Sequence, residues 1–236
     1  MNAFSYRVQT LQPSAIREIL KFTADPEVIS FAAGNPAPEA FPTEEIARIT
    51  NEILTTTPID ALQYSITEGY TPLRNWIKDD LKKKGMFNEN DEDVVITSGA
   101  QQAIEVVTKE ICNEGDTIIC EAPTFIGSLN AFRSYNAKLV GVEMEDDGIN
   151  IDKLEKALIE NPRTAFIYLI PNFQNPTGKT MSLEKRKAVL ALAQKYNVYI
   201  LEDNPYGDLR YIGENVPTIK SLDKNGCLLY TSDAAD

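Results

Sequence analysis

Between residues 93 and 203, short apolar runs alternate with longer amphipathic segments. The runs are rich in Val, Ile, Leu and Tyr with little polar alternation, which is typical of strands buried on both faces of a sheet. The predicted strands are 93–97, 116–122, 137–144, 164–170 and 197–203, and the predicted helices between them are 100–111, 125–135, 151–160 and 182–196. This alternation predicts a three-layer α/β/α domain with a mostly parallel sheet.

The residues before this region give weaker signals. Prolines interrupt the first fifty residues, and the pattern predicts short helices over 14–22 and 43–55. Thr71 followed by Pro72 has the form of a helix start, and Gly85 stands where that helix should end. A helix is therefore expected to precede the first strand.

Composition and charge exclude several classes of partner and chemistry. The formal net charge of −12 argues against nucleic acid or an anionic membrane as partner, since both need a basic face. No apolar run approaches the roughly 20 residues that span a bilayer, and the N-terminus lacks the features of a signal peptide. The three cysteines have no metal-type spacing and fit a reducing cytoplasm. The chain has no histidine, so acid–base work must fall to Lys, Tyr, Asp, Glu or a cofactor, and no metal site is predicted.

Two of the predicted strands lead into turns that could hold a flat anionic ligand. In folds of this class, ligands bind beyond the carboxyl ends of the strands. The turn 98–101 opens directly into a helix, where backbone N–H groups and the helix dipole favour a phosphate, although a simple tight turn explains it equally well. Phe125 follows the next strand and could stack on a ring, with a core position as the alternative.

Two further strand ends are polar. The turn 171–178 places two asparagines around a proline, a costly arrangement unless that backbone shape is needed. Glu202 and Asp203 stand at the end of a buried strand, where a carboxylate needs a cationic partner. We interpret Glu202 as a helix-capping or surface residue. Asp203, with Tyr206 three residues later, is harder to explain in that way. The combination of these strand ends indicates a flat, phosphorylated ligand with a cationic ring atom.

At this point the sequence resembles a known family. Asn-Pro-Thr-Gly (175–178), Asp203-x-x-Tyr206 and Ser-Gly-Ala-Gln (98–101) occur in the order seen in class I/II aminotransferases of fold type I, which depend on pyridoxal 5'-phosphate. Phe-Ala-Ala-Gly-Asn-Pro (31–36) and the stretches 62–74 and 170–178 resemble the branch of 2-aminoadipate and kynurenine aminotransferases. The resemblance covers residues from about 5 to 225.

The resemblance implies a role for each of these residues toward the cofactor. Asp203 would lie against the ring nitrogen, and Asn175 and Tyr206 would hydrogen-bond the phenolic oxygen. Phe125 would stack on the ring, where this branch often has Tyr. Three further positions, Gly99, Ala100 and Gln101, would hold the phosphate through backbone N–H groups, and Tyr64 would reach the phosphate of the neighbouring subunit.

The resemblance also implies a substrate site. Ser14 and Arg17 share one face of the predicted helix 14–22, and the matching arginine of the family can bind the distal carboxylate of glutamate or 2-aminoadipate. An exposed amphipathic helix is the alternative for Arg17. Gly34 would leave room over the substrate, and Asn175 would also contact it.

Other parts of the family pattern are not found. The Schiff-base lysine of the family lies past Asp203 in a Ser-x-Ser-Lys stretch, and no lysine of this chain has that context, so we predict no catalytic residue. The family sheet has the order 3-2-4-5-6-7-1, in which residues 93–97 are strand 1, Cys227 begins strand 6, and strand 7 is missing. We therefore expect an α/β fold truncated before its last strands.

The resemblance to the family implies a domain layout and a function. Residues 1–50 would belong to the small domain and the substrate-site arm, 51–226 would form an incomplete cofactor-binding large domain, and 227–236 would be a non-native tail. The expected function is amino transfer between amino acids and 2-oxo acids by a cytoplasmic homodimer, of which this chain is an inactive fragment. A non-catalytic binding module, as in regulators with an aminotransferase-like half, and a pseudoenzyme remain open as alternatives.

Overall fold

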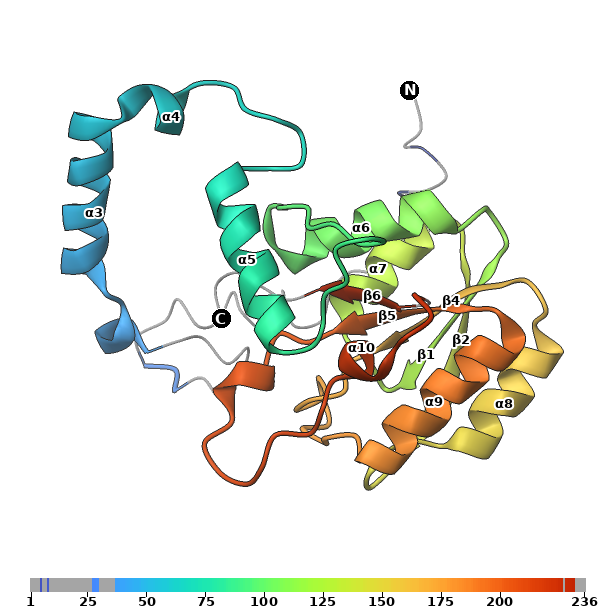
Figure 1. Ribbon diagram of the computed structural model, residues 1–236. Helices are drawn as coiled ribbons and strands as arrows, with labels where there is room; N and C mark the ends of the chain where they lie inside the picture. The colour runs from blue at the N-terminus through green and yellow to red at the C-terminus, as the bar shows by residue number, and fades with distance from the viewer. Residues whose placement is uncertain (1–4, 6–7, 9–26, 30–36, 227, 232–236) are drawn as a thin grey trace. The chain divides into compact units, whose positions relative to one another are not determined.

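The computed structural model describes residues 5, 8, 27–29, 37–226 and 228–231 (Figure 1). The chain divides into two compact units, one formed by Met1–Leu11 with Thr71–Asp236 and the other by Gln12–Tyr70. The predicted domain layout and the non-native origin of 227–236 stay predictions.

The described part of the smaller unit contains three helical segments joined by loops. It contains η2 (Pro38–Ala40), α3 (Thr43–Thr56) and α4 (Pro58–Leu62). The helix predicted over 43–55 is thus confirmed as α3, whose first turn carries two glutamates that complement the helix dipole. The helix predicted over 14–22 lies outside the described residues.

The larger unit is built on one six-stranded sheet. Its strands are β1 (Thr117–Ala122), β2 (Lys138–Glu145), β3 (Gly148–Ile149), β4 (Thr164–Leu169), β5 (Tyr199–Asp203) and β6 (Leu228–Thr231). The order across the sheet is β3-β2-β1-β4-β5-β6, and all neighbours are parallel except β2 and β3. The order expected from the family is therefore confirmed from its strand 3 to its strand 6, and the short edge strand β3 is an addition.

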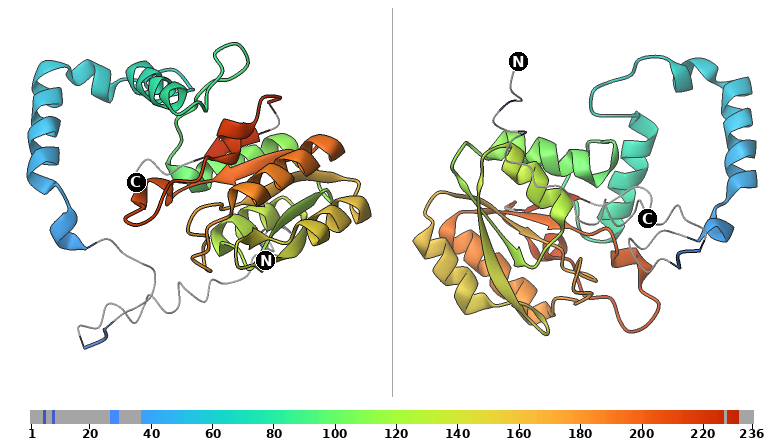
Figure 2. Two further views of the ribbon diagram at one scale, coloured as in Figure 1. Left: turned by 60° about the horizontal axis from the view of Figure 1, so that its bottom comes forward. Right: turned by 180° about the vertical axis from the view of Figure 1, so that it is seen from behind.

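Helices cover both faces of this sheet, as the alternation of the sequence predicted (Figures 1 and 2). They are α6 (Gly99–Ile111), α7 (Ile126–Ser134), α8 (Ile151–Glu160), α9 (Leu183–Tyr196) and α10 (Ile219–Leu222). The larger unit also contains α5 (Thr71–Lys83) and η3 (Gly207–Leu209). The predicted cap of α9 is confirmed, because the Ser182 side chain accepts a hydrogen bond from the Lys185 N–H.

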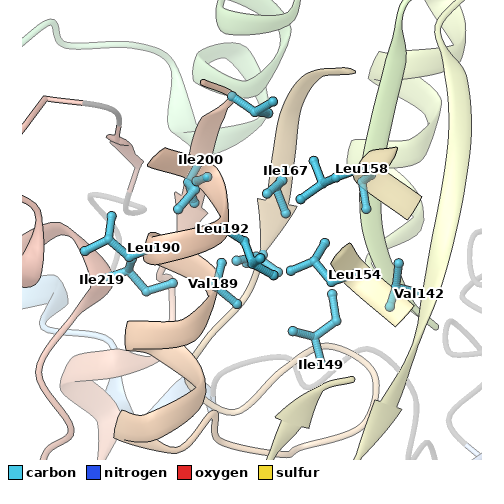
Figure 3. Packing of buried hydrophobic residues seen from close by; sticks show 14 of the residues in the cluster. Val142, Ile149, Leu154, Leu158, Ile167, Val189, Leu190, Leu192, Ile200 and Ile219 are labelled. Carbon is cyan, nitrogen blue, oxygen red and sulfur yellow. The ribbon is translucent and has the colours of Figure 1, made fainter. Parts of the chain in front are cut away.

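Successive residues of the central strands pack into different layers. Ile167 of β4 belongs to the core beneath α8 and α9, together with residues such as Leu154 and Val189 (Figure 3). Its neighbour Phe166 belongs to the opposite core, with Phe132 of α7. Because side chains alternate along a strand, apolar residues at every position are what a sheet covered on both faces requires.

The strand predicted over 93–97 is wrong. These residues form no strand, and Val95 is 60% exposed. A strand is defined by its ladder of hydrogen bonds to a neighbour, and no strand of the described chain lies beside this segment. The segment is held instead by Arg74 of α5, whose Nε donates to the Val94 carbonyl at 2.6 Å and whose Nη2 contacts the Asp93 carboxylate at 2.7 Å.

The described residues contain neither a membrane-spanning helix nor a metal-binding cluster. None of the helices there is long and apolar enough to cross a bilayer. Nor does that part of the chain gather three or more Cys, Asp or Glu side chains in a way that could hold a metal ion.

Candidate functional site

The carboxyl ends of β1, β4 and β5 meet at one edge of the sheet, because these strands are parallel neighbours. A cavity of about 180 Å³ opens there. It is lined by Ala100, Gln101, Ile104, Phe125, Ile170, Asn175, Asp203, Pro205 and Tyr206. Six residues predicted from the sequence to contact a cofactor thus lie together around one cavity.

The remaining predicted site residues lie elsewhere. Gly99 is the first residue of α6, next to the lining residue Ala100. Tyr64 is 97% exposed and belongs to the smaller compact unit. Ser14, Arg17 and Gly34 lie outside the described residues.

The start of α6 forms one end of the site. Gly99 has φ +76°, a conformation that glycine adopts at little cost. The Ser98 side chain makes no capping hydrogen bond, as far as the described residues show. The first N–H groups of a helix have no partner within it, so this turn is suited to an anion.

Phe125 lies close to the backbone at Gly127. A Cβ at position 127 would lie 2.5 Å from Cε1 of the Phe125 ring and 2.7 Å from the Gln101 amide oxygen. The Gln101 amide donates to the Gly127 carbonyl at 3.2 Å. Glycine at this position therefore lets the aromatic ring and the α6 turn approach each other, an effect that the sequence alone did not reveal.

Asn175 and Tyr206 are in contact in the lining of the cavity, with the Asn175 amide donating to the Tyr206 hydroxyl at 3.2 Å. The turn that carries Asn175 is organised by Gln174, which is 1% exposed. The Gln174 amide donates to the Pro123 carbonyl at 2.8 Å, and its oxygen accepts from the Thr177 hydroxyl at 2.7 Å. Gln174 was not predicted, because nothing in the sequence distinguishes it from a loop residue exposed to solvent.

Glu121 is a second unpredicted polar group of this region. It is 1% exposed near the end of β1, and its Oε2 accepts from the Ile170 N–H at 3.1 Å and the Gln174 amide at 3.3 Å. Its Oε1 has no hydrogen-bond partner among the described residues. Burial raises the pKa of Glu121 to about 8, so near neutral pH the protonated form predominates. The available signal was a lone glutamate within an otherwise apolar strand.

Glu202 is a cap, as interpreted from the sequence, but the surface alternative is wrong. The residue is fully buried. Its two carboxylate oxygens accept from the Ile219 N–H at 3.0 Å and the Lys220 N–H at 2.8 Å, at the start of α10. Burial raises the pKa of Glu202 to about 7 despite these donors.

Arg186 of α9 is fully buried and holds the loops of the site through hydrogen bonds. It donates to the Pro171 carbonyl at 3.0 Å and to the Asn172 side-chain oxygen at 2.8 Å. The Asn172 amide in turn donates to the Asn204 oxygen at 2.6 Å. The loops that carry Asn175 and Tyr206 are therefore joined beneath the cavity by one chain of hydrogen bonds.

A second hollow of about 420 Å³ lies between α5 and the segment after it. It is larger, but it is lined mostly by charged side chains, two of which, Lys82 and Glu89, pair with each other. None of the residues that the sequence predicted to contact a cofactor lines it. We therefore take the smaller cavity as the candidate site.

The residues of the smaller cavity fit pyridoxal phosphate. They offer an aromatic face at Phe125, a carboxylate at Asp203, an amide and a phenol at Asn175 and Tyr206, and a helix N-terminus at Ala100. A pyridine ring with a basic nitrogen, a phenolic oxygen and a phosphate presents the complementary groups.

Comparison with known proteins gives the same family. The family model "Aminotransferase class I and II" matches residues 26–231. Aromatic-amino-acid aminotransferase 1 of Thermococcus litoralis is 42% identical over 231 residues, covering 96% of this chain and 55% of that protein. The 2-aminoadipate transaminase of Thermus thermophilus is 41% identical, covering 93% of this chain and 54% of that protein.

A solved structure shows the same fold. The kynurenine aminotransferase of Pyrococcus horikoshii, solved in complex with PMP, matches with a TM-score of 0.90 and 37% identity, over 98% of this chain and 58% of that chain. The chain thus spans a little over half the length of the relatives it matches. The family model covers most of the chain, and the cofactor it indicates is pyridoxal phosphate. The chain belongs to the class I and II aminotransferase family.

Proposed function

We propose that the chain forms the cofactor-binding part of an aminotransferase that moves amino groups between amino acids and 2-oxo acids. The observation that carries this proposal is the cavity at the carboxyl ends of β1, β4 and β5, where six residues of the expected set meet. In the bound state, the cofactor ring supplies a sink for negative charge that develops at the substrate α-carbon.

Each residue of the cavity has a role in this proposal. Asp203 faces the ring nitrogen and keeps a proton on it, because a nearby negative charge favours the protonated form. Asn175 and Tyr206 donate to the phenolic oxygen of the ring, and Phe125 covers one face of it. Backbone N–H groups from Gly99 to Gln101 bind the phosphate.

The substrate and assembly proposals rest on the family alone. Arg17 would bind a distal carboxylate of the substrate, with Ser14, Gly34 and Asn175 nearby. Tyr64 would complete the phosphate site of a second subunit in a homodimer. The cytoplasm is the compartment proposed, since Cys112 and Cys120 are both free thiols.

We infer that the chain by itself binds the cofactor but does not transfer amino groups. None of the described residues that line the cavity is a lysine. The covalent step of the family needs an amine at that place. Transamination of glutamate with a 2-oxo acid by the 236-residue chain would contradict this part of the proposal.

Titration of the chain with pyridoxamine 5'-phosphate, followed by cofactor fluorescence, tests the cavity. Asp203→Asn should weaken binding about tenfold or more, because it removes the charge opposite the ring nitrogen. Asp208→Asn is the matched control, since this nearby carboxylate has a side chain that is 77% exposed and is absent from the cavity lining. Equal affinities for both variants and the original chain would contradict the proposed site.

A further inference from the structure

Two hydroxyl groups form a hydrogen-bond series that ends at the Asp203 carboxylate. The Tyr168 hydroxyl on β4 lies 2.6 Å from Asp203 Oδ2, and the Ser128 hydroxyl on α7 lies 2.8 Å from the Tyr168 oxygen. An ionised carboxylate only accepts hydrogen bonds, so Tyr168 must donate to Asp203. The Tyr168 oxygen is then left to accept, and Ser128 donates to it. The hydrogen bonds of this series therefore run in one direction: Ser128 donates to Tyr168, and Tyr168 donates to Asp203.

The surroundings of this hydrogen-bond series are apolar. Tyr168 and Ser128 are fully buried, and Asp203 is 4% exposed. The Tyr168 ring packs edge-to-face on Phe132, with ring centroids 5.3 Å apart. Burial, and after it the charge of Asp203, raises the pKa of Tyr168 well above its usual value, so the hydroxyl keeps its proton. Tyr168 is thus a permanent donor held rigidly by its ring.

Apolar surroundings favour the protonated, neutral form of a buried carboxylate such as Asp203. Burial disfavours the charged form, and a neutral Asp203 could not hold a proton on a ring nitrogen. A hydrogen bond donated to the charged form opposes that effect, and a second donor in line strengthens the first. Tyr168 also restrains the orientation of the carboxylate, because it contacts Oδ2.

We propose that Tyr168, supported by Ser128, is a positioning residue that keeps the Asp203 carboxylate ionised and oriented toward the cofactor's ring nitrogen. This inference rests on the proposed function of the cavity. The alternative is that Tyr168 only fills the core against Phe132. The two readings differ in a measurable way, since a positioning role matters only for a ligand that carries the ring nitrogen.

The test compares two ligands on the 236-residue chain. One is pyridoxamine 5'-phosphate, and the other is its analogue in which the ring nitrogen is replaced by CH. Tyr168→Phe keeps the ring and removes only the hydroxyl. It should weaken binding of the nitrogen ligand about tenfold and leave binding of the CH analogue nearly unchanged. Ser128→Ala should act in the same direction with a smaller effect.

The matched control is Tyr196→Phe, because Tyr196 also donates to a carboxylate, that of Glu155, at 3.0 Å, and does not line the cavity. This variant should bind both ligands as the original chain does. Equal weakening of both ligands by Tyr168→Phe would show a packing role and overturn the inference, as would unchanged binding of both. If Tyr168→Phe does not fold, the same comparison on Ser128→Ala decides the question.

Failure of the proposed function gives a different result. In that case the original chain would bind the two ligands equally, or would bind neither, and the inference would fall with the function. A preference of the original chain for the nitrogen ligand that survives in both the Tyr168 and Ser128 variants would overturn the inference alone.

Discussion

Glu121 predicts an unusual dependence of stability on pH. Its pKa is raised by burial from an ordinary value of 4.5 to about 8 in the folded chain. Between these two values the folded state holds a proton that the unfolded state has released. Stability from this group is therefore fully present below pH 4.5 and is lost as pH rises through 8. This is opposite to the trend of a carboxylate held in an ion pair.

The size of the effect follows from the two pKa values. Each pH unit in this interval changes the free energy of unfolding by about 1.4 kcal/mol, so raising the pH from 6 to 9 should cost about 3 kcal/mol through Glu121. Glu202, with a pKa raised to about 7, should add about 1 kcal/mol in the same direction. Against a typical stability of roughly 5–15 kcal/mol, the sum is large.

Glu121→Gln isolates the contribution of this residue. Among the described residues, donors reach Glu121 Oε2 and not Oε1, so the glutamine oxygen can replace Oε2. Urea denaturation at pH 6 and pH 9 measures the change within each protein, and any constant offset from the substitution cancels. The original chain should lose about 4 kcal/mol and the variant about 1 kcal/mol. Equal losses in the two proteins would refute the reasoning.

Three further predictions concern the buried polar groups. Glu202→Gln should lower the free energy of unfolding, measured with urea at pH 6, by about 1–3 kcal/mol. Both Glu202 oxygens accept backbone N–H groups, and the glutamine amide would face one of these donors. An unchanged free energy of unfolding would contradict this prediction. Arg186→Met should cost about 3 kcal/mol or more in the same assay, since it leaves several buried oxygens without their donor, and a loss below about 1 kcal/mol would show that the loops hold without it. Gln174→Leu should weaken pyridoxamine 5'-phosphate binding about tenfold by releasing the turn that carries Asn175, and unchanged affinity in a fluorescence titration would show that the turn is rigid by itself.

The layers of the fold could be predicted because their signal is local. A strand such as 164–169 is apolar at successive positions, and the helix before it, α8, shows one apolar face. These patterns say that both faces of the sheet are covered, whatever the order of the strands. The segment 93–97 shows the limit of this reasoning. It has the composition of a strand, yet a strand also needs a neighbour, and composition carries no information on whether one is present.

The candidate site, too, could be predicted from the sequence only in part. Asp203, Asn175 and Phe125 could be predicted because each lies at or just after the end of a strand, where parallel strands bring their carboxyl ends together, and because the motifs around them resemble those of the family. The groups that hold them, Tyr168 and Gln174, could not. Tyr168 reads as one more apolar residue of its strand, and its function depends on a hydroxyl that points at Asp203, 35 positions away. Sequence patterns place the groups that would contact a ligand, whereas contacts between distant residues decide the charge and orientation with which those groups act.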